Sequence, residues 1–214
     1  CGWMGLDVYC GPKGIPYQPD RLYLQRADGT FADATDRLEG QVPRPAFQAV
    51  AADFDGDGDV DVYVANDSEP NHLWVNDGTG RFTDETAWRM PLDWTWSYAK
   101  AGDVDGDGDP DLVTGQRLLL NNGQGWFSDR TAGRLPPTQD RYDGIDLGDV
   151  DGDGDLDMVL ADWGSELPTS VGPGGFTKLW LQLDSPTAFG EPGTDFPGAR
   201  AGRVDLRERV RRLE

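Results

Sequence analysis

The sequence has few of the side chains that bind soft metals or nucleic acids. Its 214 residues include two cysteines, Cys1 and Cys10, and one histidine, His72, which excludes the usual four-ligand zinc sites. Lys and Arg number 19 against 39 Asp and Glu, a formal net charge of −20. Because such a surface repels phosphate, nucleic-acid binding is disfavoured. Apolar runs extend over only a few residues, so no segment is a candidate transmembrane helix.

Motifs for catalysis are also missing. The sequence contains no G-x-S-x-G nucleophile motif, no phosphate-binding G-x-x-x-x-G-K and no G-x-G-x-x-G that opens a helix. His72 stands at the start of a predicted strand, and we expect it at the surface rather than acting as a base. The sequence therefore predicts a protein that is not an enzyme. The alternative, a propeller enzyme that acts on polysaccharides, would need acid–base pairs outside the acidic loops described next.

Acidic residues are concentrated in three nine-residue stretches. Loops 1, 2 and 3 are "DFDGDGDVD" (53–61), "DVDGDGDPD" (103–111) and "DVDGDGDLD" (149–157), with five Asp each and so 15 of the 39 acidic residues. The other 24 face 19 Lys and Arg, so most of the net charge lies in the loops. Carboxylates this close repel one another, and protonating them at neutral pH costs free energy. A bound cation would remove the repulsion.

The spacing within each loop favours Ca²⁺. Carboxylates at positions 1, 3 and 5 can converge on one point, while glycines at positions 4 and 6 let the backbone curl around it. Position 7 would add a carbonyl oxygen, and the Asp at position 9 could bind with both oxygens. This flexible, all-oxygen shell suits Ca²⁺ better than Mg²⁺. The alternative is a solvated acidic turn without metal.

A helix–loop–helix calcium site is excluded. Its loop needs Glu at position 12, where loops 1, 2 and 3 have Val64, Thr114 and Leu160. The residues that follow each loop are β-branched and apolar, which indicates a strand. The three loops therefore connect strands.

The loops belong to a longer repeat, because their starts are 50 and 46 residues apart. Three segments share the same order of elements: a strand with alternating apolar residues, an Asn/Asp–Gly turn, and a second strand that ends in Asp-x-Thr. They are "RLYLQRADGTFADAT" (21–35), "HLWVNDGTGRFTDET" (72–86) and "RLLLNNGQGWFSDRT" (117–131). A strand with small residues precedes each acidic loop. Each unit therefore predicts four antiparallel strands, A to D, with the acidic loop between A and B.

Four antiparallel strands that recur at this period are typical of a propeller blade. The predicted fold is all-β, a partial β-propeller of about three and a half four-stranded blades. Residues 1–20 form an N-terminal segment, 21–185 the blades, and 186–214 a tail that is rich in arginine and could form a short basic helix. Since closed propellers need about four to eight blades, we expect a homo-oligomer, a partner subunit or further sequence to complete the ring.

These units resemble the FG-GAP/VCBS repeats of integrin-α-like β-propellers, whose blades bind Ca²⁺ through a D-x-D-G-D-G-x-x-D loop between strands A and B. The N-terminal "CGWMGLDVYCGPKGIPYQPDRLY" is similar to a segment of bacterial extracellular proteins of the ASPIC/UnbV type. The resemblance implies about three Ca²⁺ ions. In loop 1 it implies side-chain ligands Asp53, Asp55, Asp57 and Asp61, with the carbonyl oxygen of Asp59. In loops 2 and 3 it implies Asp103, Asp105, Asp107, Asp109 and Asp111, and Asp149, Asp151, Asp153, Asp155 and Asp157.

The cysteines and the calcium loops suggest the same compartment. Cys1 and Cys10 are close enough in sequence to form a disulfide, which implies an oxidising environment. Calcium loops of modest affinity imply millimolar Ca²⁺. We therefore expect an extracellular, periplasmic or cell-surface protein. Two alternatives for Cys1 stay open: it is the lipid-bearing first residue of a lipoprotein, or it is where a longer chain was cut.

Strand order predicts where a ligand would bind. In a four-strand meander the A–B and C–D connections share one edge, and the B–C and D–A connections share the other. Long loops on a rigid scaffold commonly bind ligands, so we expect the ligand surface opposite the acidic loops. Its candidate residues are Trp88, Trp94, Arg141, Tyr142 and Trp163. The expected function is a non-catalytic module that recognises protein or glycan, with a structural subunit of a larger surface assembly as the alternative.

Overall fold

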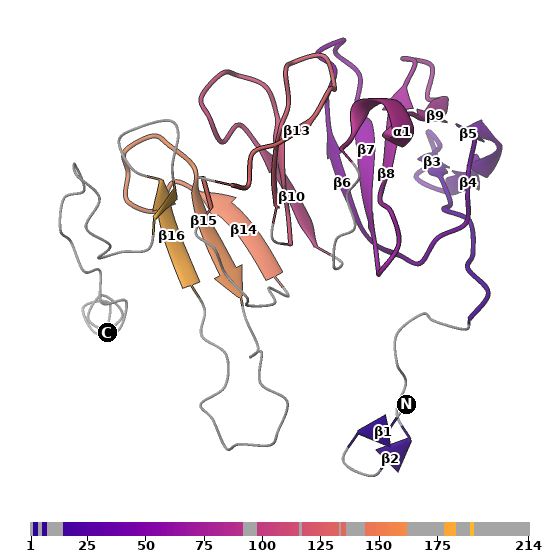
Figure 1. Ribbon diagram of the computed structural model, residues 1–214. Helices are drawn as coiled ribbons and strands as arrows, with labels where there is room; N and C mark the ends of the chain where they lie inside the picture. The colour runs from indigo at the N-terminus through magenta and orange to yellow at the C-terminus, as the bar shows by residue number, and fades with distance from the viewer. Residues whose placement is uncertain are drawn as a thin grey trace.

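In the computed structural model, the regular secondary structure of the described residues is almost entirely β-strand (Figure 1). It describes residues 15–91, 98–115, 117–132, 134–135 and 144–161, and the backbone of short strands at 2–3, 6–7, 178–182 and 189–190. No helix within these residues is long and apolar enough to cross a membrane. Several predictions fall outside the described residues: the Cys1–Cys10 disulfide, the basic tail, and the ligand-surface residues Trp94, Arg141, Tyr142 and Trp163.

Three antiparallel sheets follow one another along the chain. Repeat 1 comprises β6 (Ala46–Ala52), β7 (Asp61–Asn66), β8 (His72–Asn76) and β9 (Phe82–Asp84). Repeat 2 comprises β10 (Ala99–Gly102), β11 (Asp111–Thr114), β12 (Arg117–Leu120) and β13 (Ser128–Asp129). Repeat 3 comprises β14 (Gly144–Gly148), β15 (Asp157–Ala161), β16 (Lys178–Gln182) and β17 (Phe189–Gly190). Within each repeat the strands pair in chain order, which confirms the predicted A-to-D meander.

Shorter elements precede repeat 1 and follow its last strand. The hairpin of β3 (Tyr23–Gln25) and β4 (Phe31–Asp33) is the predicted C–D pair of an earlier unit. A 3-10 helix, η1 (Thr35–Arg37), leads into β5 (Leu38–Glu39), which pairs in parallel with β9. The single-turn helix α1 (Thr86–Arg89) follows β9. Near the N-terminus β1 (Gly2–Trp3) pairs with β2 (Leu6–Asp7).

The A strands of the three repeats contact one another, β6 with β10 and β10 with β14. Ala99 donates its backbone N–H to the Gln48 side chain at 3.0 Å, and Lys100 Nζ lies 3.1 Å from Asp146 Oδ1. Alanine and glycine dominate β10, and such small side chains let strands approach closely. The sheets are therefore side by side with their first strands together (Figure 1).

Apolar side chains fill the spaces between successive sheets, because the two faces of each strand alternate along the chain. Residues shared between repeats 1 and 2 are Tyr63, Leu73, Leu112, Leu119 and Phe127. Residues shared between repeats 2 and 3 are Val113, Leu118, Ile145, Met158 and Leu160. Residues between the β3–β4 hairpin region and repeat 1 are Leu22, Leu38, Val64, Trp74 and Phe82. Each repeat thus depends on its neighbours for burial of its apolar faces.

His72 is fully buried, so the prediction that it lies at the surface was wrong. Its Nδ1 lies 3.2 Å from Asp20 Oδ2 and its Nε2 lies 3.9 Å from Asp84 Oδ2. Trp74 Nε1 donates to the same Asp20 oxygen at 3.2 Å. The polar partner of His72 is thus Asp20, 52 residues away in sequence. The residues around His72 in the sequence do not indicate this contact.

Candidate metal centre

The first Asp of each acidic loop organises the turn. Asp53 accepts the backbone N–H of Gly56 at Oδ1 (2.8 Å) and that of Gly58 at Oδ2 (3.0 Å). The two glycines have φ of 72° and 94°, a conformation that other residues rarely adopt. Loops 2 and 3 repeat the pattern with Asp103, Gly106 and Gly108, and with Asp149, Gly152 and Gly154. The Asp-x-x-Gly-x-Gly spacing therefore encodes the turn itself.

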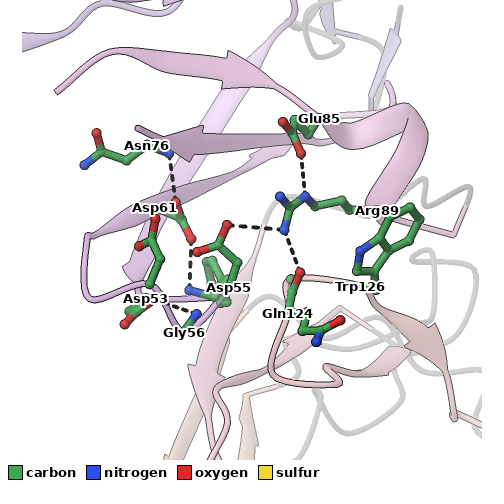
Figure 2. A network of polar contacts seen from close by, with 12 residues as sticks. Asp53, Asp55, Gly56, Asp61, Asn76, Glu85, Arg89, Gln124 and Trp126 are labelled. Atoms are coloured by element: carbon green, nitrogen blue, oxygen red, sulfur yellow. Dashed lines mark hydrogen bonds and ion pairs between the residues drawn. The ribbon is translucent and has the colours of Figure 1, made fainter. Parts of the chain in front are cut away.

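The ninth residue closes each loop at the start of strand B and is buried in all three repeats. Asp61 accepts the backbone N–H of Phe54 at 3.0 Å and that of Asn76 at 2.9 Å (Figure 2). Asp111 accepts those of Val104 and Asn121 at 3.0 and 2.8 Å. Burial raises the pKa of Asp61, and it raises the pKa of Asp111 to about 7 despite these hydrogen bonds. A cation nearby would favour the ionised form of both.

In loops 1 and 2, the two carboxylate oxygens of the third residue have different surroundings. The Asp55 side chain is 14% exposed, and its Oδ2 lies 3.3 Å from Arg89 Nη1 (Figure 2). The Asp105 side chain is 17% exposed, and its Oδ2 lies 3.8 Å from Arg134 Nη1. In both residues Oδ1 is buried and has no hydrogen-bond partner among the described residues. Burial, followed by a neighbouring aspartate (Asp57 or Asp107), raises the pKa of both carboxyls.

Carboxylate oxygens converge in each loop. In each of three groups, one oxygen per residue lies within 4.8 Å of the others: Asp53, Asp55 and Asp57; Asp103, Asp105 and Asp111; Asp149, Asp151 and Asp157. Asp61, Asp107 and Asp153 fall outside these groups, as do Asp59, Asp109 and Asp155, the residues expected to supply carbonyl oxygens. The donors are all oxygen, and the orphaned Oδ1 atoms of Asp55 and Asp105 lack a partner that a hard cation would supply. The residues present therefore fit Ca²⁺.

Sequence reasoning missed the residues that surround these loops. Arg89 and Arg134 occupy the same place in a shared Asp-x-Thr-x-x-Arg pattern, 84–89 and 129–134. Asn121 donates its side-chain Nδ2 to the Phe54 carbonyl oxygen of loop 1 at 2.7 Å. The arginine pattern was visible in the aligned repeats, whereas the contact of Asn121 depends on the packing of two sheets.

One predicted ligand-surface residue, Trp88, lies among the described residues. It belongs to α1 and is 72% exposed. The sequence predicts that Trp88 lies at the edge opposite the acidic loops. In the structure the adjacent Arg89 contacts loop 1, so this part of the predicted surface is next to an acidic loop instead. Trp126 is also more than half exposed, and a backbone hydrogen bond from Phe127 N–H to the Arg89 carbonyl (2.8 Å) brings these two segments together.

Comparison with known proteins places these repeats in a family. A family model described as the FG-GAP-like repeat matches residues 5–64, 53–114 and 115–160. The chain belongs to the FG-GAP-like repeat family. Each matched stretch ends in strand B of a repeat: residue 64 lies in β7, residue 114 in β11 and residue 160 in β15. The three FG-GAP-like matches therefore follow the structural repeat.

No curated protein matches this FG-GAP-like chain. A solved structure does resemble it. The crystal structure of the V. cholerae biofilm matrix protein Bap1 is 16% identical to it, with a TM-score of 0.43. The match covers 75% of this chain and 22% of that one. The chain thus spans about a fifth of the length of Bap1.

Proposed function

We propose that this chain is a calcium-stabilised, non-catalytic binding or assembly module, built as part of a β-propeller. The observation that carries the proposal is the convergence of three carboxylates within 4.8 Å in each of three equivalent loops. The side-by-side meanders with adjacent A strands support the propeller arrangement. Three similar sites in three successive repeats favour a structural role for the ion over a single catalytic one.

Calcium would be held by the five Asp of each loop. Position 1 also fixes the turn, position 3 offers its buried Oδ1, position 7 its carbonyl oxygen, and position 9 lies at the start of strand B. Bound Ca²⁺ would neutralise carboxylates that otherwise repel one another and would fix the A–B connection. The residues are Asp53, Asp55, Asp57, Asp59 and Asp61; Asp103, Asp105, Asp107, Asp109 and Asp111; and Asp149, Asp151, Asp153, Asp155 and Asp157.

The cellular setting follows from the expected affinity. Extracellular calcium modules have Kd values of about 10⁻⁴–10⁻³ M, and such sites fill only where Ca²⁺ is millimolar. We therefore propose an extracellular, periplasmic or cell-surface location. The proposed ligand is a protein or glycan, and the exposed indole of Trp88 is the described side chain best suited to stack on it. A partner subunit or a second copy of this chain would cover the outer faces of the three repeats and so complete the propeller.

Thermal unfolding in Ca²⁺ and in EGTA tests the proposal. A site with a Kd of about 10⁻⁴ M adds roughly 1.4 kcal/mol of stability at about 1 mM Ca²⁺. We expect a rise in Tm that decreases in each of Asp55→Asn, Asp105→Asn and Asp151→Asn. Asp36→Asn, in η1 and outside the loops, is the control and should retain the full rise. Equal Tm values in Ca²⁺ and EGTA for the wild type would refute the proposed calcium sites.

Ligand class and assembly need separate measurements. Binding to a glycan array or to a partner protein, lost in Trp88→Ala, would support recognition through this surface. The oligomeric mass in Ca²⁺ would show whether copies associate. Turnover of a polysaccharide would contradict the non-catalytic assignment.

A further inference from the structure

We infer that Arg89 and Arg134 are built-in counter-ions of loops 1 and 2: they hold the loops in shape without Ca²⁺ and weaken its binding. This inference rests on the proposed calcium function. In each of two repeats, one oxygen of an aspartate carboxylate faces an arginine, and the other oxygen is left for a cation. This arrangement is the basis of the inference.

Arg89 connects three parts of the structure. Its Nη1 lies 3.3 Å from Asp55 Oδ2 in loop 1 and donates to the Gln124 carbonyl oxygen of repeat 2 at 2.6 Å (Figure 2). Its Nε donates to Glu85, one helical turn earlier. Arg89 is mostly buried, so solvent screens these charges less than at an open surface. The guanidinium therefore both neutralises loop 1 and attaches it to the next repeat.

A similar arginine occurs in the preceding unit, one position closer to the Asp-x-Thr sequence than Arg89 and Arg134. Arg37, which follows strand D of the preceding hairpin, donates from Nη1 to the Thr79 carbonyl oxygen at 3.1 Å, as Arg89 does to that of Gln124. A Cβ on Gly125 would lie 2.4 Å from Arg89 Nη1, and one on Gly80 would lie 3.2 Å from Arg37 Nη1. Equivalent glycines thus leave room for equivalent guanidinium groups. The contact between an arginine and a carbonyl oxygen of the next C–D hairpin therefore recurs in two units.

The arginine contacts one oxygen of the carboxylate and leaves the other free. In Asp55 and Asp105, Oδ2 faces the arginine, while Oδ1 is buried without a partner among the described residues. A carboxylate can therefore contact arginine and Ca²⁺ at once. The positive guanidinium lowers the repulsion among carboxylates in the metal-free loop, and it repels a divalent ion in the occupied loop. Both effects reduce the free energy gained when Ca²⁺ binds.

Loop 3 offers an internal comparison. Asp151 is more exposed than Asp55 and Asp105, and within the described part of the chain no Lys or Arg lies within 4 Å of it. Loop 3 should therefore bind Ca²⁺ independently of Arg89 and Arg134.

The test is the Arg89→Gln variant, studied by calorimetric Ca²⁺ titration and by thermal unfolding in Ca²⁺ and in EGTA. We expect one of the sites to bind Ca²⁺ more tightly, on the order of tenfold. The Tm in EGTA should fall more than the Tm in Ca²⁺. Arg89→Lys keeps the charge but not the guanidinium contacts with Glu85 and Gln124, so its affinity should lie between those of Arg89→Gln and the wild type. Arg21→Gln removes an arginine that is 56% exposed and paired with Asp33. This control should change neither the Ca²⁺ affinity nor the Tm.

The outcomes separate the inference from the proposed function. A wild type that binds no Ca²⁺ overturns both. A wild type that binds Ca²⁺, with an Arg89→Gln variant of equal or weaker affinity and an equal Tm loss in both conditions, overturns the counter-ion role alone. If Arg89→Gln folds only in Ca²⁺, the inference is supported. If it folds in neither condition, Arg134→Gln at loop 2 decides, and an unchanged affinity there overturns the inference.

Discussion

Asn121 donates a hydrogen bond from its side-chain Nδ2 to the carbonyl oxygen of Phe54, 2.7 Å away in the preceding repeat. The same side chain accepts the backbone N–H groups of Asn122 and Gly125 at 2.8 and 3.1 Å. Its own backbone N–H donates to Asp111 of loop 2. One residue thus links the hairpin of repeat 2, its acidic loop and the acidic loop of repeat 1. The loops are therefore part of the interface between repeats.

Asn121→Ala should lower the free energy of unfolding by about 2 kcal/mol, because it leaves the buried Phe54 carbonyl oxygen without a partner. Asn76→Ala is the matched control. Asn76 has the equivalent place in repeat 1 and accepts the N–H groups of Gly78 and Gly80, but its Nδ2 donates within its own repeat, to Val60. Urea unfolding of both variants measures the difference, and an equal loss would contradict the role of the link between repeats.

Gly56 and Gly58 lie in the same loop and test the same interface through backbone packing. Both have positive φ, so alanine strains both. A Cβ on Gly56 would lie 3.0 Å from the carbonyl oxygen of Gly123 in repeat 2, whereas one on Gly58 meets nothing within 4 Å. Gly56→Ala should therefore be less stable than Gly58→Ala by roughly 1 kcal/mol in urea unfolding. Equal stabilities would show that repeat 2 can move away at no cost.

Much of the fold could be predicted because its signals are local. The turns around Gly78 and Gly123, the alternation of strand residues and the Asp–Gly loops each specify structure within about ten residues. Contacts between repeats could not be predicted in this way. Arg89 and Asp55 are separated by 34 positions, and His72 and Asp20 by 52. Such pairs meet only after sheets stack, so single-sequence patterns identified the acidic loops but not their arginine and asparagine partners.

His72 should contribute to stability through its contact with the Asp20 carboxylate. His72→Leu would remove the imidazole contact with Asp20, a carboxylate that is mostly buried. We expect a loss of about 2–3 kcal/mol in the free energy of unfolding. His72→Gln, which can still donate a hydrogen bond, should lose less. Arg21→Leu removes one partner of a solvent-exposed pair and should change stability by less than about 1 kcal/mol. A His72→Leu loss as small as that of Arg21→Leu would contradict this prediction.

The metal-free protein should become more stable as the pH falls from about 8 to about 5. Burial raises the pKa of Asp111 from 3.8 to about 7 in the folded protein, and burial also raises the pKa of Asp55, Asp61 and Asp105. Between the unfolded and folded pKa values the native state binds more protons than the unfolded state. Stability therefore increases towards low pH and is lost as the pH rises through about 7.

Calcium should oppose this dependence, because it binds the ionised carboxylates and its contribution decreases as they become protonated. The measurement is urea unfolding at several pH values in EGTA and in Ca²⁺. Asp111→Asn cannot ionise, so its stability in EGTA should change less with pH than that of the wild type. The slope with pH is the informative quantity, since the substitution also weakens a hydrogen bond from Val104 or Asn121. An unchanged slope would mean that Asp111 stays ionised in the metal-free fold, which would contradict this prediction.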